Sequence, residues 1–208
     1  WWRRRCGAEP GVAMPPQSTD DLDGILDAAW RLLAAGAAGD ARAWNRPALA
    51  TVRADGAPSV RTVVLRAVDE EARCLRLHTD IRSAKVADLG AEPRSALHVY
   101  DGEAAIQLRI DGIVSVHRAG PLADRAWADS RLSSRLCYRV EPGPGRPIAR
   151  PEQGHPPAGG DPEAGRERFA VLLFAVTRLE WLHLGADGHR RAAFDWPQGR
   201  LSRQWLVP

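Results

Sequence analysis

The stretch PALATVRADGAPSVRTVVLRAV, residues 47–68, decides the fold. Two short apolar runs flank ADGAP, in which Asp55-Gly56 is a strong turn signal. We therefore predict a β-hairpin whose second strand contains RTVVLR. Because side chains alternate across a strand, Arg61 and Arg66 are expected on opposite faces. Either both arginines are solvent-exposed at the two ends of an ordinary strand, or both bind a ligand.

The rest of the chain continues with short strands and a few helices. Alternating or continuous apolar runs predict strands at CLRLHT (74–79), SALHVY (95–100), IQLRIDGIVSVH (106–117), RFAVLLFAVTRLEWLHL (168–184), RRAAFDW (190–196) and LSRQWLVP (201–208). Helices are expected at residues 18–36, capped by Ser18 or Thr19 and ended by Gly36, at 81–93, and at 121–132 from Pro121. This mainly β pattern, with six or more mostly antiparallel strands, favours an antiparallel barrel over a βαβ sheet.

Composition limits the class of protein. The 208 residues have a net charge of +3, and their positive charge is scattered, which gives little support for nucleic-acid binding. No apolar run reaches the roughly 18–20 residues that span a bilayer. Cys6, Cys74 and Cys137 have no CxxC spacing, which argues against a disulfide framework or a zinc site and favours a reducing cytoplasm.

The domain boundaries follow from local composition. Residues 1–17 are expected to be a disordered extension, with residues 1–13 preceding a more natural start at Met14. Residues 18–208 are expected to form one domain. Residues 139–165 are rich in Pro and Gly and predict a long, mobile loop within it.

Familiar catalytic motifs are missing from the sequence. It contains no GxGxxG after a strand, no Walker loop, no HExxH and no GxSxG, and its histidines form no helical i, i+4 pair for a metal. What remains is Thr79, Ser83 and Lys85 at the start of the helix at 81–93; Lys85 is the single lysine of the chain. A helix N-terminus with hydroxyls and a cation suits a phosphate. An ordinary helix capped by Asp80 or Thr79, with Lys85 exposed, fits equally well.

Four motifs in order carry a resemblance to a known family: RTVVLR, HTDIRSAK (78–85), EPRSALHVY (92–100) and IQLRIDGIV (106–114). From about Asn45 to the C-terminus the chain resembles the pyridoxamine 5′-phosphate oxidase family of FMN-binding split β-barrels. The resemblance implies a homodimeric, FMN-dependent oxidoreductase with FMN at the subunit interface, and hydride transfer from a small-molecule substrate to flavin N5.

The resemblance also implies roles for individual residues. Arg61, Arg66, Ser83 and Lys85 are expected at the FMN phosphate, Gln107 and Trp181 around the flavin ring, and Arg191 at its edge. His189 is the expected substrate-facing catalytic group, and Trp127 and Arg131 are expected at the substrate. The full set implied for FMN is Arg61, Val63, Val64, Leu65, Arg66, His78, Thr79, Ser83, Lys85, Gln107, Trp181 and Arg191.

Several positions depart from the family pattern. Arg66 replaces a lysine, His78 and Trp127 replace tyrosines, and Ala84 replaces an arginine, with Arg82 as a candidate substitute. The family's substrate arginine is Asp187, its Q-S pair is absent after Arg131, and its terminal RLAP is WLVP. FMN binding is therefore better supported than pyridoxamine phosphate oxidation. The alternatives are a genuine pyridoxamine/pyridoxine 5′-phosphate oxidase, a flavin-binding module without turnover, and, least favoured, a nucleic-acid-binding protein.

Overall fold

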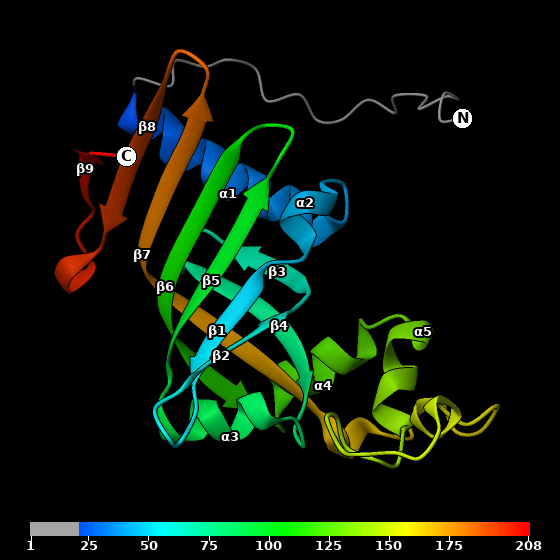
Figure 1. Cartoon of the computed structure of the whole chain (residues 1–208). Coiled ribbons are helices and arrows are strands. Elements are labelled where there is room, and N and C mark those ends of the chain that lie inside the picture. The colour runs from blue at the N-terminus through cyan, green and yellow to red at the C-terminus, as the bar shows by residue number, and fades with distance from the viewer. Residues whose placement is uncertain (1–20) are drawn as a thin grey trace, which may run out of the picture.

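The computed structural model describes residues 21–208 (Figure 1), so the predictions for residues 1–17 lie outside the described part of the chain. The helices are α1 (Leu22–Ala38), α2 (Arg42–Asn45), α3 (Ala84–Ala91), α4 (Pro121–Ala128) and α5 (Leu132–Arg135). The strands are β1 (Ala48–Val52), β2 (Pro58–Thr62), β3 (Leu65–Asp69), β4 (Cys74–Asp80), β5 (Arg94–Asp101), β6 (Ile106–His117), β7 (Phe169–Gly185), β8 (Gly188–Asp195) and β9 (Ser202–Leu206).

All these strands join one antiparallel sheet. Its order is β2-β1-β5-β6-β7-β4-β3, with β8 paired to β7 and β9 to β8. The long strand β7 pairs with β6 on one side, and on the other side first with β4 and then with β8. The sheet bends around this shared strand, and the predicted split β-barrel is confirmed.

The opening hairpin is confirmed at its turn. Gly56 has φ +82°, and its N–H donates to Arg53 O at 2.8 Å. This left-handed backbone is the conformation that glycine adopts at little cost. The Asp55 carboxylate accepts from the Ala57 N–H at 3.0 Å and closes the same turn.

The placement of Arg61 and Arg66 on one strand is wrong. β2 ends at Thr62, where the chain leaves the hairpin, and the Val63 N–H donates to Pro47 O at 2.9 Å. β3 begins at Leu65, and its pairing with β4 shifts register between Leu65 and Ala67. RTVVLR therefore links two strands that lie at opposite ends of the sheet order.

Both predicted ends of the first helix are also corrected. Asp21 is the cap, because its carboxylate accepts from the N–H groups of Asp23 and Gly24; Ser18 and Thr19 lie outside the described residues. The helix passes through Gly36 and ends at Gly39, which has φ +94°. Gly36 is needed for close packing instead, since a Cβ there would lie 2.6 Å from the Trp44 backbone.

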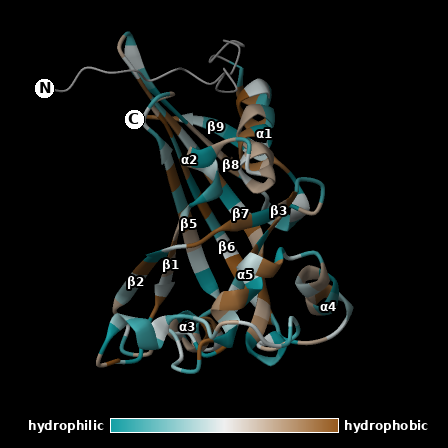
Figure 2. Cartoon of the chain, turned by 90° about the vertical axis from the view of Figure 1, so that its right-hand side faces the viewer, coloured by the Kyte–Doolittle hydropathy of each residue, from teal (hydrophilic) through white to brown (hydrophobic). Residues whose placement is uncertain are grey.

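The main core lies between α1 and the barrel strands, with Trp30 and Leu33 of α1 among its buried residues. α1 lies behind the sheet in Figure 1 and to its right in Figure 2. No helix of the described residues covers the opposite face of β5 and β6, and α3 closes the lower end of the barrel. Within residues 21–208, no helix is long and apolar enough to cross a membrane.

A second, smaller core lies where α4 packs on β7. Its buried residues are Ala123, Ala126, Trp127, Tyr138, Phe169 and Val171. Residues 139–165 continue from this core, beyond α5 in Figure 1, and contain a 3-10 turn at Pro151–Gly154 but no strand or α-helix. The predicted loop is confirmed as a loop.

Candidate functional site

A polar cluster forms where β4 leads into α3. Thr79 is the penultimate residue of β4, and Ser83 is the N-cap of α3. Lys85 Nζ lies 3.1 Å from both Thr79 Oγ1 and Ser83 Oγ, and the two hydroxyl oxygens are themselves 3.1 Å apart. The Ser83 hydroxyl donates to Asp80 O at 2.7 Å and does not cap α3 with its side chain. The alternative in which Asp80 or Thr79 caps the helix and Lys85 is exposed is therefore wrong.

Arg61 reaches the same end of the barrel from β2. Its guanidinium donates to Thr51 Oγ1 at 2.7 Å and to Ser59 Oγ at 2.6 Å, and it lies 3.5 Å from Asp88 Oδ2 of α3. Asp88 is buried and also accepts from Thr51 Oγ1 at 2.8 Å. The guanidinium is thus fixed by residues from two strands and a helix, and Arg61 is not a solvent-exposed strand end.

The two cations of this cluster influence each other. Burial and the charge of Arg61 lower the pKa of Lys85, while Asp80 and Asp88 act in the opposite direction. An anionic group placed against Lys85 would stabilise its protonated form. We call Arg61, Thr79, Ser83 and Lys85 the anion cluster, and its cations and hydroxyls match the chemistry of a phosphate monoester.

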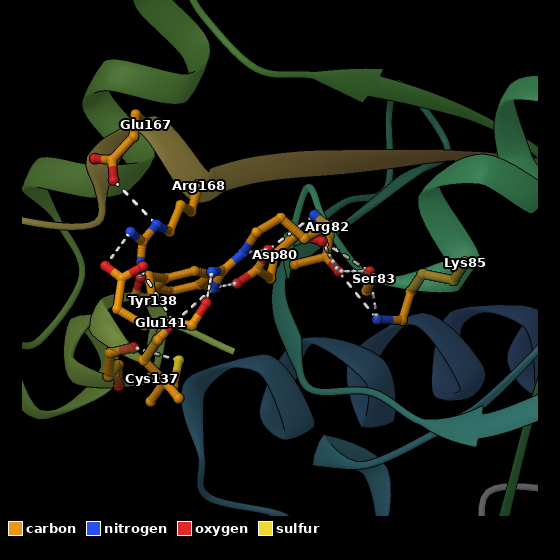
Figure 3. Close-up of polar contacts among 12 residues, drawn as sticks. Asp80, Arg82, Ser83, Lys85, Cys137, Tyr138, Glu141, Glu167 and Arg168 are labelled. Carbon is orange, nitrogen blue, oxygen red and sulfur yellow. Dashed lines mark hydrogen bonds and ion pairs between the residues drawn. The ribbon is translucent and has the colours of Figure 1, made fainter. Parts of the chain in front are cut away.

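Arg82 does not replace the arginine missing at Ala84. Figure 3 shows its side chain directed away from Lys85. It forms an ion pair with Asp80 at 2.6 Å and donates to the carbonyls of Glu141 at 2.9 Å and Val140 at 3.0 Å. Arg168 also donates to Val140 O and pairs with Glu141 at 2.6 Å. Arg82 and Arg168 therefore anchor the start of the loop at 139–165.

Arg66 has different neighbours from Arg61. Its charge acts on His78, Cys137 and Tyr138, which places it on the outer side of β4. His78 packs its ring edge-on to Phe169 at 4.8 Å, and its buried Nε2 has no hydrogen-bond partner among the described residues. Burial, Arg66 and Arg76 lower the pKa of His78 to about 3, so the ring is neutral at physiological pH.

The other expected residues of the RTVVLR motif are mostly interior. Val63 and Leu65 are buried in the main core, and Val64 is partly buried. Their side chains help to fix the chain between β2 and β3. The Leu65 carbonyl accepts from Asn45 Nδ2 at 3.3 Å.

Gln107 and Arg191 share the helix-free face of the sheet. Leu182 of β7 is opposite Gln107 of β6 on one side and opposite Arg191 of β8 on the other. Residues opposite each other in neighbouring strands point to the same face of a sheet, so Gln107 and Arg191 lie on one face. Gln107 Oε1 lies 3.1 Å from His98 Nε2, and Arg191 donates to Glu180 Oε2 at 2.6 Å. Burial would raise the pKa of Glu180, but its bonds to Arg191 and Arg178 prevail and lower it.

Trp181 and Gln107 lie on opposite faces of the sheet. It pairs with Leu108 and Ala192, which face the barrel interior, and it is 2% exposed within the main core. The structure therefore gives Trp181 a packing role within one chain, and the flavin stacking implied for it has no exposed ring face here.

His189 lies beside the turn between β7 and β8, opposite Leu184 and exposed to solvent. That turn is at the upper end of the sheet, whereas α3 is at the lower end (Figures 1 and 2). Gln107, His189 and Arg191 thus form an upper set, and the anion cluster forms a lower set. One chain does not bring the two sets together.

The expected substrate residues lie on the small core. Trp127 is buried there, with its ring edge-on to Tyr138 and Phe169, and its Nε1 donates to Glu163 at 2.6 Å. Arg131 is exposed and is the N-cap residue of α5. The sequence reasoning missed Asp88, Arg135 and Glu163, because their roles depend on contacts between segments far apart in the chain.

Comparisons with known proteins give a consistent result. The family description "Pyridoxamine 5′-phosphate oxidase, FMN-binding domain" matches residues 27–118. The chain is 33% identical to pyridoxine/pyridoxamine 5′-phosphate oxidase 2 of Arabidopsis thaliana over 144 residues, covering 65% of this chain and 72% of that protein. It is 40% identical to the pyridoxine/pyridoxamine 5′-phosphate oxidase of Burkholderia cenocepacia over 92 residues, covering 44% of this chain and 42% of that protein.

A solved structure also resembles the fold. It is a pyridoxamine 5′-phosphate oxidase-related, FMN-binding protein from Nostoc punctiforme, with a TM-score of 0.73 and 23% sequence identity. The alignment covers 92% of this chain and all of that one. At this identity the likeness supports the split-barrel fold.

Proposed function

The chain belongs to the pyridoxamine 5′-phosphate oxidase family of FMN-binding proteins, and on that basis we propose that it binds FMN and acts as an FMN-dependent oxidoreductase. The observation that carries the proposal is the anion cluster, in which Lys85 and Arg61 lie with two buried hydroxyls at the start of a helix. A phosphate monoester is the group such a cluster suits. When bound, FMN would supply the redox chemistry, accepting a hydride from a small-molecule substrate.

The chain's own residues would bind and orient the cofactor. Lys85 and Arg61 would neutralise the phosphate, and Thr79 and Ser83 would donate hydrogen bonds to it. Gln107 and Arg191, on the helix-free face, would contact the flavin ring. His189 would face the substrate from the same set of strands.

We also infer a homodimer. The anion cluster and the upper set lie at opposite ends of one sheet, so one cofactor could contact both only if the upper set comes from a second chain. The helix-free face also exposes Val60, Tyr100 and Ile113, which are apolar side chains that an interface would cover.

The first test measures FMN binding directly. Purified protein should show flavin absorbance bands at about 375 and 450 nm. Added FMN should raise the melting temperature of the protein, because a ligand that binds the folded state stabilises that state. Lys85→Ala should weaken FMN affinity by about 1.5–3 kcal/mol, the range for a hydrogen bond to a charged group, and we expect a similar loss for Arg61→Ala, the second cation of the anion cluster. Arg31→Ala removes an exposed cation of α1, bonded to Asp27 O and away from the helix-free face, and is the control, which should bind FMN as the wild type does.

A colourless protein with no thermal response to FMN would contradict the proposal. Unchanged FMN affinity in both Lys85→Ala and Arg61→Ala would place the phosphate elsewhere.

A second candidate function is oxidation of pyridoxamine or pyridoxine 5′-phosphate. The names of the Arabidopsis and Burkholderia relatives favour it. The exposed carboxylate of Asp187, where the family has an arginine, opposes it by repelling a phosphorylated substrate. Peroxide release from FMN-loaded protein with pyridoxamine 5′-phosphate would support this candidate, and the absence of peroxide at saturating FMN would exclude it.

FMN binding without turnover of any amine or alcohol phosphate would favour a flavin-binding module.

A further inference from the structure

Trp127 and Arg135 together hold a carboxylate that comes from another part of the chain. The indole Nε1 donates to Glu163 Oε2 at 2.6 Å, and Arg135 Nη1 donates to Glu163 Oε1 at 2.8 Å. Each carboxylate oxygen thus receives one donor. We propose that Trp127 and Arg135 form a binding site for the carboxylate of a small-molecule ligand, and that Glu163 is its built-in occupant, which the ligand displaces.

The two donors are held in place without Glu163. Arg135 Nε donates to Ser130 O at 3.1 Å and Nη2 to Ala128 O at 2.9 Å, and the guanidinium lies 5.0 Å from the centre of the Trp127 ring. The indole packs against Tyr138 and Phe169. Because these contacts are independent of Glu163, its departure would leave a preorganised pair of donors.

Glu163 itself is held less firmly than its partners. Its side chain is 61% exposed, whereas the Arg135 side chain is 10% exposed and Trp127 is 3% exposed. It stands near the end of the loop at 139–165, with Gly159 and Gly160 before it at φ +67° and +92°. Of the three groups, Glu163 is therefore the one that can leave by a local change of backbone.

There is room for a ligand beside this contact. A pocket of about 340 Å³ is lined by Asp124, Trp127, Ala128, Arg135, Glu163 and Arg166. Arg166 pairs with Asp124 at 2.5 Å, and Arg135 pairs with Glu163, so the pocket has no net charge while Glu163 is in place. Without Glu163 its net charge is +1, which favours a ligand carrying one negative charge.

The same geometry favours a carboxylate over a phosphate monoester. The pocket offers two donors, one for each oxygen, and one unpaired cation. A phosphate dianion has a further oxygen and a second charge, which match more donors and cations than this pocket supplies. The anion cluster at α3, with Lys85 and Arg61, has that second cation.

This carboxylate site goes beyond the proposed FMN function and does not depend on it. None of its residues belongs to the anion cluster. Of the two residues that the family resemblance assigns to the substrate, Trp127 lines the pocket and Arg131 does not. Failure of FMN binding would leave the inference intact, and its own failure would leave FMN binding intact.

The test uses the full chain and benzoate as the probe. Thermal unfolding is followed across a sodium benzoate titration at constant ionic strength for the wild type and for Glu163→Ala. Glu152→Ala is the matched control, because it removes an exposed carboxylate from the same loop without touching the pocket. Glu163→Ala combined with Trp127→Phe keeps the ring packing and removes the indole donor.

We expect saturable stabilisation of Glu163→Ala, with a benzoate Kd at least tenfold lower than in the wild type or in Glu152→Ala. The reason is that Glu163 competes from within the chain, at an effective concentration in the millimolar range or above. Adding Trp127→Phe should abolish the gain. In NMR spectra of Glu163→Ala, the Trp127 indole N–H resonance should move back toward its wild-type position as benzoate is added, a reading that does not require the double variant to fold.

Three results would overturn the inference. The first is no saturable stabilisation of Glu163→Ala together with an unmoved indole resonance. The second is equal stabilisation of the wild type and Glu163→Ala, which would place benzoate elsewhere. The third is stronger stabilisation of Glu163→Ala by inorganic phosphate than by benzoate, which would contradict the carboxylate assignment.

Discussion

Lys85 shows how a single residue is prepared for an anion. Burial and the neighbouring Arg61 charge make its ammonium group easier to deprotonate, and so lower its pKa. The nearby hydroxyls of Thr79 and Ser83 keep the side chain in place. A bound phosphate would reduce the repulsion between Lys85 and Arg61. The charges are thus preorganised for an anion, and binding requires little rearrangement of the site.

His78 gives a prediction about stability and pH. Its folded-state pKa of about 3 lies below the ordinary value of 6.5, because burial, Arg66 and Arg76 disfavour the charged ring. Between these values the unfolded chain takes up a proton and the folded chain does not. The free energy of unfolding should therefore fall as pH drops from about 6.5 toward 3, by up to about 1.4 kcal/mol per pH unit from this residue.

Urea unfolding of the wild type and His78→Phe at several pH values checks this expectation. The variant should lose less stability between pH 6.5 and 5, whereas between pH 7 and 8 the two should run parallel. At neutral pH the variant should be at least as stable, because the buried Nε2 has no hydrogen-bond partner among the described residues. Identical slopes below pH 6.5 would contradict the assignment.

At the scale of elements, strands were easier to predict than the junctions between them. Alternation located β4, β5 and β6 closely, because a half-buried strand imposes a period of two on its sequence. The break within RTVVLR has no such signal, since it depends on a bond from the Val63 N–H to Pro47 O and a register shift at Leu65. Trp181 stands between Glu180 and Leu182, so its neighbours in sequence differ in polarity, and the pairing of β7 shows that its side chain faces the barrel interior.

Gly112 gives a prediction for the central strand pair. It stands at the register shift between β6 and β7, where a Cβ would lie 2.2 Å from Phe174 Cε1 and 2.5 Å from Ala175 O. Gly112→Ala should therefore destabilise the protein by about 1–3 kcal/mol or more, as overpacking does. Gly90→Ala is the control, because no atom lies within 4 Å of its Cβ position in α3, and it should gain up to about 1 kcal/mol. Urea unfolding measures both, and an unchanged midpoint for Gly112→Ala would contradict the packing argument.

For the whole molecule, the sequence motifs identified the anion cluster but not how far it lies from Gln107 and Arg191. The family pattern gives the residues of a site without saying which chain supplies each one. The strand directions separate the two sets within one chain, since β4 and α3 meet at the lower end and the β7–β8 turn stands at the upper end (Figure 1). Residues that a family pattern assigns to one site can therefore lie far apart in one chain.

The proposed homodimer predicts the effect of a charge on the helix-free face. Ile113 is 50% exposed on β6, so Ile113→Glu should cause little loss of folding stability but should weaken association by burying a charge at the interface. Sedimentation should then show a monomer, and FMN affinity should fall with it. Leu132→Glu, on α5 with 61% exposure, is the control and should remain dimeric. A wild type that sediments as a monomer while binding FMN would contradict the shared site.

The position of β7 between β6 and β4 has a consequence for synthesis of the protein. β6 ends at His117 and β7 begins at Phe169, so about 50 residues separate them. A ribosome adding roughly 5–20 residues per second needs about 3–10 seconds for that stretch. During this interval the nascent chain carries two unpaired, apolar strand edges on β4 and β6. We expect this to be the period in which the growing chain depends most on chaperones.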